Sequence, residues 1–362
     1  MSKKNKILLV HLVANGDCLM ATTIARQIKK DYEGCHLTWA ISFKCVPMLY
    51  LNPYVDEIME INYGKDDSPF GNVWLNLKNQ IKGMEFEHVF YTQIFPDNDW
   101  CYDGTTRSST FRAYKHEINV PVTPVFRISP EEREKIAAFA LKHKLGNYDH
   151  RILFECTPGS GQSSITLELA IAISEQLIRS NSSLIIIIST FKNFNSSSHR
   201  IINGAELTLR ENAALSHHCN FLIGCSSGIS WLLTSDDAKK LPSVQILNGN
   251  AYGFRFASMS YDFRYFGLND SHIIETDCCT VNETSEIINH ALENFQSARN
   301  KYHKIFVPGN DYCVFLAIEK IRKREWSKAI TILMNFTKRN GFRLKLYVIF
   351  LKSILKLPFS KV

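Results

Sequence analysis

Residues 6–17 read Lys6-Ile-Leu-Leu-Val-His-Leu-Val-Ala-Asn-Gly-Asp17, and a helical pattern follows from Cys18 to Lys30. The apolar run after Lys6 has the composition of a buried strand, and Asn15-Gly16 is a typical turn. A strand that passes through a glycine turn into a helix is the first unit of an open parallel α/β sheet. Such sheets bind their ligands at the carboxyl ends of the strands. We therefore expect Asp17 to lie at the mouth of a cleft.

Strand and helix patterns alternate along the rest of the chain, which is typical of a parallel sheet. The segment 95–115 interrupts the alternation and is predicted to be a long functional loop or a partly helical insertion. In the first third of the chain the predicted strands are 7–10, 36–41, 55–61 and 88–94, and the predicted helices are 18–30, 45–51 and 72–82.

A second α/β series begins after Val120-Pro-Val-Thr-Pro124, which has the composition of an extended linker. Ser129-Pro130-Glu131-Glu132 is a typical helix start, with a capping serine, a proline and two acids in the first turn. Later strands are predicted at 151–156, 184–189, 221–223 and 243–247, and later helices at 168–179, 211–217, 229–233 and 283–296. We predict two facing Rossmann-like α/β domains, residues 1–125 and 126–305 with a linker at about 117–130, followed by a helical tail, 306–362.

Composition narrows the class of protein. The ten cysteines have no CxxC spacing, so reduced thiols in a cytosolic protein are expected and no metal site is predicted. Neither a signal peptide nor a run of about 20 apolar residues is recognised, so a cytoplasmic location is expected.

The charge is uneven: residues 319–362 hold 12 Lys/Arg and 2 Asp/Glu, a net +10, whereas residues 1–318 hold 30 and 33, a net −3. This asymmetry favours an anionic partner for the tail.

Asp17 has two possible roles. A carboxylate at a rigid strand-to-helix corner suits a general base that takes a proton from a hydroxyl. An acid at this position is also a common helix cap, and one side chain can do both.

Two further strand-to-helix turns are rich in glycine and serine. Backbone N–H groups in the loop Thr157–Ser163 could cradle a diphosphate, although a plain flexible connection has the same composition. The same reasoning applies to Gly224-Cys-Ser-Ser-Gly228. This second turn also fits G-x-S-x-G, so a serine hydrolase using Ser226, with a later histidine at 272, 290 or 303, is an alternative.

In this order the motifs resemble those of the family 9 glycosyltransferases, the heptosyltransferase-like group, over roughly residues 6–300. The similar stretches are Gly16-Asp17, Asn52-Pro-Tyr-Val-Asp-Glu-Ile58, Leu207-Thr-Leu-Arg-Glu-Asn-Ala213 and Ile223-Gly-Cys-Ser-Ser-Gly228. The resemblance implies a GT-B fold, Asp17 as catalytic base, an acceptor-binding first domain and a second domain that binds a nucleotide-diphosphate sugar.

The departures from the family pattern leave the donor open. Ser226 stands where the family has an aspartate, Trp231 replaces the histidine of heptosyltransferases, and the usual loop lysine is absent between Gly159 and Leu167. A catalytically inactive relic that binds a sugar nucleotide or glycan is therefore a second reading.

The resemblance also assigns binding residues by position, with Leu207 near the nucleobase. The long loop contributes an aromatic residue and two arginines to the acceptor side, because aromatic rings stack on sugars and arginines bind acidic groups; an ordinary polar surface loop is the alternative. The expected donor-binding residues are Thr157, Ser160, Gly161, Gln162, Ser163, Leu207, Ser226, Ser227 and Gly228, and the expected acceptor-binding residues are Asn15, Gly16, Trp100, Arg107 and Arg112.

The tail combines basic and apolar side chains at helical spacing, with one stripe from Trp326 to Met334 and a break at Gly341. Such a pattern is typical of an interfacial helix on an anionic membrane, and equally of a helical hairpin packed on the body. If the tail is interfacial, a chain ending near Val307 should still fold.

Together these features predict an inverting, metal-independent glycosyltransferase without a cofactor. Its donor would be a nucleotide-diphosphate sugar, and its acceptor a lipid-linked, lipopolysaccharide-type envelope saccharide. The enzyme would be cytoplasmic and peripheral at the inner face of the cell membrane, and would bind no nucleic acid.

Overall fold

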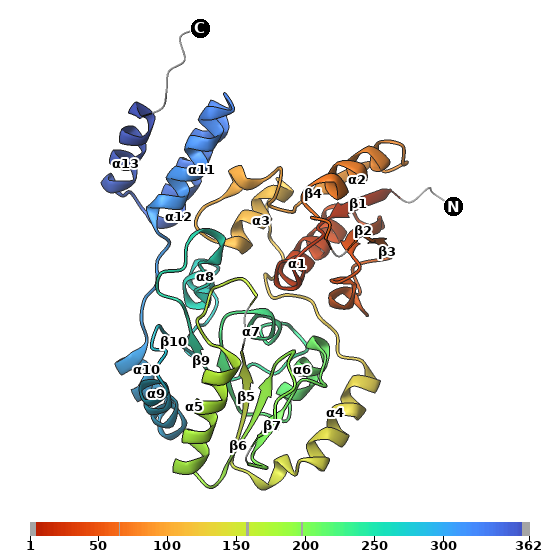
Figure 1. Ribbon diagram of the computed structural model, residues 1–362. Coiled ribbons are helices and arrows are strands. Elements are labelled where there is room, and N and C mark those ends of the chain that lie inside the picture. Colours follow the sequence, from red (N-terminus) through yellow and green to blue (C-terminus); the bar gives the residue numbers. More distant parts are fainter. Residues whose placement is uncertain (1–4, 65, 157–158, 197, 357–362) are drawn as a thin grey trace.

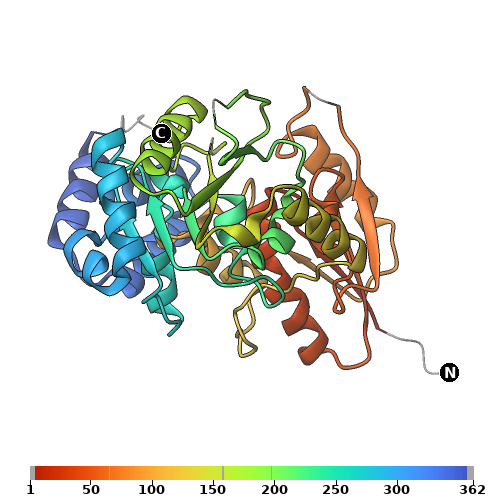
Figure 2. The ribbon, with the colours of Figure 1, turned by 90° about the horizontal axis from the view of Figure 1, so that it is seen from below.

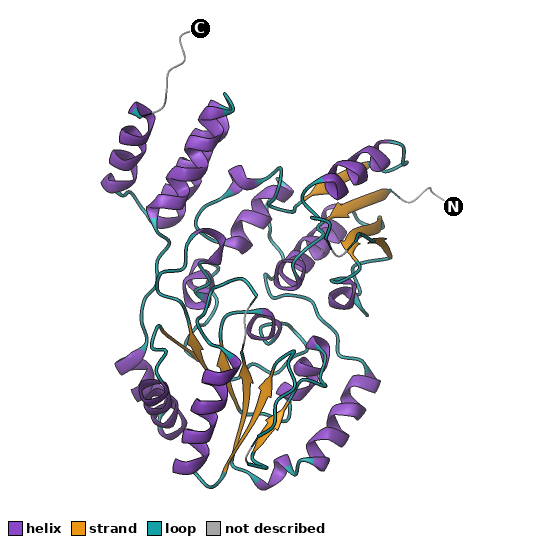
Figure 3. Cartoon of the chain, in the orientation of Figure 1, coloured by secondary structure: helices purple, strands orange, loops and turns teal. Residues whose placement is uncertain are grey.

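The computed structural model describes residues 5–64, 66–156, 159–196 and 198–356. Two parallel sheets lie in separate halves of the molecule, with helices α1, α3, α7 and α8 in the region between them (Figure 1). Figure 3 shows that each sheet is enclosed by helices. This arrangement confirms the predicted α/β class with two facing Rossmann-like units.

The first half is a four-stranded sheet of order β3-β2-β1-β4, with every strand pair parallel. Alternate residues of β1 serve the two faces: Ile7 and Leu9 pack toward α1 and α3, whereas Leu8 and Val10 pack toward α2. The elements are β1 Lys6–Val10, α1 Asn15–Asp31, β2 His36–Ser42, η1 Val46–Leu49, β3 Glu57–Ile61, α2 Asn72–Lys82, β4 His88–Tyr91, η2 Asp99–Cys101 and α3 Thr106–Tyr114.

The second half is a six-stranded parallel sheet of order β10-β9-β8-β5-β6-β7. Ile186 and Ile188 of β6 face α5 and α9, while Ile185 and Ile187 face the layer with α4 and α6. The elements are α4 Pro130–Lys142, η3 Leu145–Asn147, β5 His150–Glu155, α5 Leu167–Ser180, β6 Leu184–Ser189, β7 Ile201–Asn203, α6 Leu209–Ser216, β8 Phe221–Gly224, α7 Gly228–Leu232, β9 Ser243–Ile246, η4 Gly253–Arg255, α8 Met259–Tyr265, β10 Ile273–Thr276, α9 Val281–Glu293 and α10 Phe295–Tyr302.

Each sheet has one topological switch point, where the chain leaves the sheet centre in opposite directions. In the first sheet it lies between β1 and β4, and in the second between β5 and β8. Ligands of doubly wound folds bind in the crevice at such points. The strand orders therefore direct attention to the loops after these four strands.

Three helices follow the second sheet: α11 Asn310–Arg322, α12 Trp326–Asn340 and α13 Leu344–Leu355. They return the chain to the first half, where α11 and α12 contact η2 (Figures 1 and 2). Their inner faces form one apolar cluster that includes Tyr102 and Phe336. The packed alternative for the tail is thus confirmed for these inner faces.

Ion pairs and a cation–π contact reinforce the packing of the tail helices on the rest of the chain. The buried ammonium of Lys320 lies 2.7 Å from Asp99 of η2 and 3.6 Å from Glu325. The guanidinium of Arg339 stacks on Tyr265 of α8. Part of the positive charge of the tail is therefore structural.

The outer faces of the tail helices are apolar and exposed. The predicted stripe on α12 divides: Ala329 and Leu333 are buried, whereas Trp326, Ile330 and Met334 are 52–65% exposed. On α13 a second outer row is exposed, comprising Leu344, Val348, Leu351 and Leu355. None of the helices in the described segments is long and apolar enough to cross a membrane.

Candidate functional site

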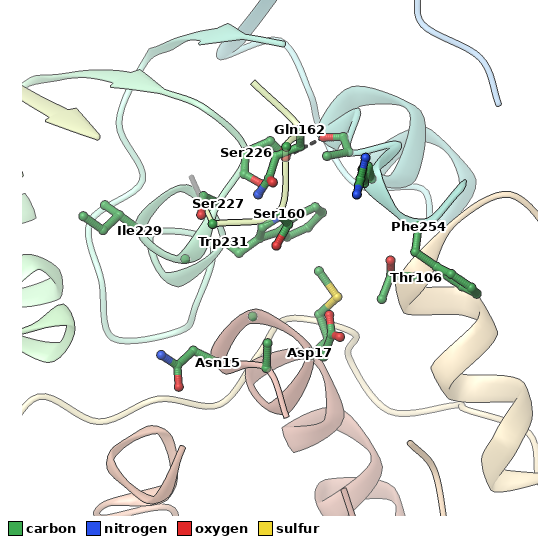
Figure 4. A pocket seen from close by; sticks show the side chains of 18 of the residues that line it. Asn15, Asp17, Thr106, Ser160, Gln162, Ser226, Ser227, Ile229, Trp231 and Phe254 are labelled. Atoms are coloured by element: carbon green, nitrogen blue, oxygen red, sulfur yellow. Dashed lines mark hydrogen bonds between the residues drawn. The ribbon is translucent and has the colours of Figure 1, made fainter. Parts of the chain in front are cut away.

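A cavity of about 1130 Å³ lies between the two halves (Figure 4). Its walls are formed by the loops at both switch points, after β1 and β4 on one side and after β5 and β8 on the other. The site therefore lies where the strand orders place it. The sequence-predicted residues that line the cavity are Asn15, Gly16, Asp17, Arg107, Ser160, Gly161, Gln162, Leu207, Ser226, Ser227 and Gly228.

Asp17 occupies the first turn of α1, on the wall contributed by the first half. Figure 4 shows its carboxylate between α1 and the side chains of Ser160 and Trp231, which belong to the opposite wall. Burial raises the pKa of the Asp17 carboxyl to about 7, although the backbone N–H of Ala14 lowers it. A carboxylate with this pKa is suited to accept a proton near neutral pH.

The loop before Asp17 is held by the other strand of its switch point. Gln93, which follows β4, accepts hydrogen bonds at 2.9 Å from the backbone N–H groups of both Leu12 and Val13. Asn98 donates in turn to the carbonyl of Gln93 at 2.9 Å. These bonds position the corner that carries Asp17, and Gln93 was not predicted as a site residue.

Three loops of the second half meet on the opposite wall. The backbone N–H of Asn248 donates to the carbonyl of Gln162 at 2.8 Å, and the Gln162 amide reaches the Ser226 carbonyl at 3.4 Å. The Ser226 hydroxyl donates to the carbonyl of Ala257. The loops after β5, β8 and β9 thus form one connected surface.

Glu155, at the end of β5, occupies the N-terminus of α7. Its buried carboxylate accepts from the N–H groups of Cys225, Ile229 and Ser230 at 2.7–3.3 Å, and also from the Ser230 hydroxyl. The N–H of Ser227 lies 3.4 Å from the same carboxylate. A side chain of the protein therefore already engages the N–H groups of Cys225, Ile229 and Ser230, so these donors are not free for a diphosphate.

Arg107 crosses from α3 of the first half into the second half. Its Nε lies 3.2 Å from a carboxylate oxygen of Asp262, and its guanidinium lies 4.9 Å from the ring centre of Trp231. All three residues line the cavity, and Arg107 is only 1% exposed. Burial raises the pKa of the Asp262 carboxyl, whereas the guanidinium of Arg107 lowers it. Arg107 thus joins the two walls at the cavity, and Trp231, the residue that replaces a histidine of the family pattern, packs against it.

Several expected site residues lie elsewhere. Trp100 is in η2 beside the tail cluster, and Arg112 donates to the carbonyl of Cys101 and pairs with Asp103. Neither lines the cavity, because the long loop folds into η2 and α3 and uses these side chains for packing. Ser163 also lies outside the lining; its hydroxyl accepts from the Ile165 N–H at 3.3 Å. Thr157 is outside the described residues.

The geometry argues against the serine-hydrolase alternative. Of the three candidate histidines, His272 lines another cavity, His290 contacts Ser297, and His303 accepts from the Glu275 N–H. Among the described residues that line the main cavity there is no histidine. Ser226 therefore has no histidine partner among the described residues of the cavity.

The lining residues that were not anticipated include Arg255, Phe254, Phe256 and Thr106. Arg255 and its neighbours follow β9, in a stretch without a recognisable motif. Within the described segments no group of three or more His, Cys, Asp or Glu side chains is placed to hold a metal ion.

The class of fold is now clear: two facing Rossmann-like domains with a cleft between them, the arrangement of the GT-B fold. A family 9 glycosyltransferase from Veillonella parvula superimposes with a TM-score of 0.52 at 15% identity, over 83% of this chain and 94% of that one. The E. coli ADP-heptose LPS heptosyltransferase II superimposes with a TM-score of 0.51 at 13% identity, over 80% of this chain and 99% of that one. No protein-family model and no curated protein matches the sequence. The structural similarity establishes that this chain has the fold of these proteins.

Proposed function

We propose that this protein is a glycosyltransferase that uses a nucleotide-diphosphate sugar as donor and Asp17 as general base. The observation that carries the proposal is the position of Asp17: a carboxylate with a pKa of about 7, at the switch point of one sheet, across a cavity from the switch point of the other. Structural neighbours with this fold include a family 9 glycosyltransferase and a heptosyltransferase.

In the proposed reaction the acceptor hydroxyl loses its proton to the Asp17 carboxylate as its oxygen forms a bond to the anomeric carbon of the donor. The bond from that carbon to the diphosphate oxygen breaks, and the electron pair leaves with the nucleoside diphosphate. Attack from the side opposite the leaving group inverts the anomeric centre. The side chains on the leaving-group wall are Ser160, Gln162 and Ser227, which can donate hydrogen bonds to diphosphate oxygens.

We propose that this chemistry proceeds without a resident metal ion. The acids that line the cavity are Asp17, Glu155 and Asp262, and two of them are engaged elsewhere: Glu155 accepts from α7, and Asp262 pairs with Arg107. Among the described residues of the cavity, no pair of acids is thereby left to bridge a cation and a diphosphate.

The acceptor is proposed to be a lipid-linked saccharide of the cell envelope, delivered at an anionic membrane surface. Exposed apolar rows on α12 and α13 are interspersed with exposed lysines such as Lys338, Lys345 and Lys352. Basic and apolar side chains on one helical surface favour binding at an anionic lipid interface. The protein would then work as a peripheral enzyme on the cytoplasmic face, in lipopolysaccharide-type biosynthesis.

A binding protein without transferase activity is the second candidate. It is favoured by the neutral Ser226 and Trp231 at positions where the family pattern is charged or titratable. The two candidates differ in one property: the binding protein would hold a sugar nucleotide without consuming it.

The test is a thermal-shift panel of five nucleoside diphosphates and their common sugar conjugates, followed by a product assay with envelope glycolipid fractions. A ligand present at 100 times its Kd adds about 2.7 kcal/mol to stability, which a melting curve detects readily. Binding with release of free nucleoside diphosphate only when acceptor is present supports the transferase. Binding without any turnover supports the second candidate, and binding of no nucleotide refutes both.

A further inference from the structure

The leaving-group wall needs positive charge that the motifs do not supply. A diphosphate carries at least two negative charges, and the N–H groups of Cys225, Ile229 and Ser230 at the start of α7 already donate to Glu155. The Gly/Ser loop has no lysine between Gly159 and Leu167. Hydroxyl and amide groups alone would have to meet the charge of the departing diphosphate.

Two arginines line the cavity among the described residues, Arg107 and Arg255. Arg107 is buried, paired with Asp262 and stacked on Trp231. Its charge therefore already has a counter-ion within the protein. Arg255 is exposed to solvent, and its guanidinium makes no hydrogen bond or ion pair with another described residue; only its backbone N–H is bonded, to the carbonyl of Tyr252. Its charge is available to a ligand.

The Arg255 side chain lies across the Gly/Ser loop. A Cβ atom built on Gly161 would stand 3.6 Å from Cδ and 4.0 Å from Cζ of Arg255. Gly161 has a φ of +73°, a left-handed conformation that glycine adopts at no steric cost. The Arg255 side chain therefore passes close to the backbone of the predicted diphosphate loop at Gly161.

The segment that carries Arg255 is itself attached to this loop. Asn248, a few residues earlier, donates to the carbonyl of Gln162, and Ala257, just after it, accepts from the Ser226 hydroxyl. Both ends of the segment are therefore tied to the leaving-group wall, which fixes where the guanidinium can reach.

We propose that Arg255 is the principal cationic ligand of the donor diphosphate, and that it replaces the loop lysine of the family pattern from a different loop. This inference rests on the proposed function. A guanidinium suits the role because its planar fork can bind two phosphate oxygens at once. The geometry places it on the wall opposite Asp17, so the base and the leaving group are served from different domains.

The experiment measures binding of ADP, GDP, UDP, CDP and dTDP, with the corresponding monophosphates, to the full-length chain by calorimetry. The variants are R255Q, which removes the charge, and R255K, which keeps a point charge. The control is R179Q, which makes the same charge change at the far end of α5, roughly 18 Å along the helix from its start.

We expect R255Q to weaken binding of the tightest-binding nucleoside diphosphate roughly 10- to 100-fold, because hydrogen bonds to charged groups have this magnitude. Binding of the corresponding monophosphate should weaken less than about threefold. The affinity of R255K should lie between those of wild type and R255Q, and R179Q should bind like wild type. Inorganic pyrophosphate should displace the nucleotide from wild type and compete poorly in R255Q.

A nucleoside diphosphate affinity of R255Q within twofold of that of wild type would overturn the assignment. Equal losses of affinity in R255Q and R179Q would overturn it too, because they would reflect only the overall charge of the protein. Both outcomes leave the proposed function standing. Wild-type protein that binds none of the five diphosphates would refute the proposed function, and the role of Arg255 with it. The melting temperature of R255Q should equal that of wild type, because the exposed side chain has no partner to lose.

Discussion

Replacing Asp17 by asparagine tests the central assignment in two independent ways. Asparagine has nearly the same shape and keeps an oxygen that can accept from the backbone N–H of Ala14. It cannot accept a proton from the acceptor hydroxyl, so transfer should fall about 100-fold or more. The second test is stability: the variant should change how the free energy of unfolding depends on pH.

The sign follows from the direction of the pKa shift. The pKa of the Asp17 carboxyl rises from 3.8 to about 7 on folding, so the folded state binds this proton more tightly than the unfolded state. The contribution of this proton to the free energy of unfolding is therefore fully present below pH 4 and is lost as the pH rises toward 7. A shift of this size corresponds to about 4 kcal/mol at most, because one pKa unit is about 1.4 kcal/mol. Because the carboxylate faces an open cavity, solvent reduces this figure, and we expect about 1–2 kcal/mol at pH 8.

Asp17→Asn should thus melt a few degrees above wild type at pH 8 and close to wild type at pH 4. Asp149→Asn is the control, since it removes an exposed carboxylate just before β5, at the end of that strand away from the cavity. For wild type, kcat/KM should rise as the pH passes through about 7, where the base becomes ionised. Transfer by Asp17→Asn within a few-fold of wild type would refute the assignment of the base. A melting difference that does not change between pH 4 and pH 8 would refute the reasoning about burial.

Four further predictions follow from the site and the tail. Transfer should survive EDTA; loss with chelation and recovery with Mg²⁺ would contradict the metal-free proposal. Glu155→Gln should destabilise the protein by about 2–4 kcal/mol in denaturant unfolding, because several buried N–H donors lose their anionic acceptor; exposed Glu168→Gln is its control. Arg107→Leu should cost about 3–5 kcal/mol by leaving Asp262 unpaired, and adding Asp262→Asn should recover part of it. Replacing Lys345 and Lys352 by glutamine should weaken sedimentation with anionic liposomes at low salt roughly tenfold or more, whereas glutamine at Lys82 and Lys142 should not, and equal binding of wild type to neutral liposomes would contradict the electrostatic argument.

The regular elements near the site were predictable because their signals are local. Helix 72–82 and strand 184–189 have the predicted bounds, and the predicted start at Ser129 is a complete capping box with Glu132. Asp17 was found because a glycine turn between a strand and a helix fixes where a side chain stands in a parallel sheet.

Short elements with weak periodicity were missed. Strands 201–203 and 273–276 are three and four residues long, and helix 259–265 has two turns. Their formation depends on the sheet and on the packing around them rather than on local preference. Arg255 lies just before helix 259–265, in a stretch without a motif, so its approach to Gly161 could not be read from spacing.

The tail shows a different limit of sequence patterns. Periodicity identified an apolar stripe on α12 but could not show that only half of it is buried. The buried half packs against Tyr102 and Phe336, which lie more than 200 residues apart in sequence. Ending the chain near Val307 would uncover this cluster and the Asp99 partner of Lys320. We therefore no longer expect such a truncated chain to fold normally. The membrane hypothesis is tested instead by the point substitutions on the outer face of α13.

The charged groups of the cavity explain how the two walls can divide the proposed reaction. Glu155 is balanced by the donors of α7, and Asp262 by Arg107, so neither repels a diphosphate strongly. Asp17 remains as the available base on the first domain, and Arg255 as the available cation on the second. A nucleophile activated at one wall and a leaving group held at the other approach the anomeric carbon from opposite sides. Inversion of configuration is thus the stereochemical outcome to expect, and a product that retained the donor configuration would contradict this division of roles.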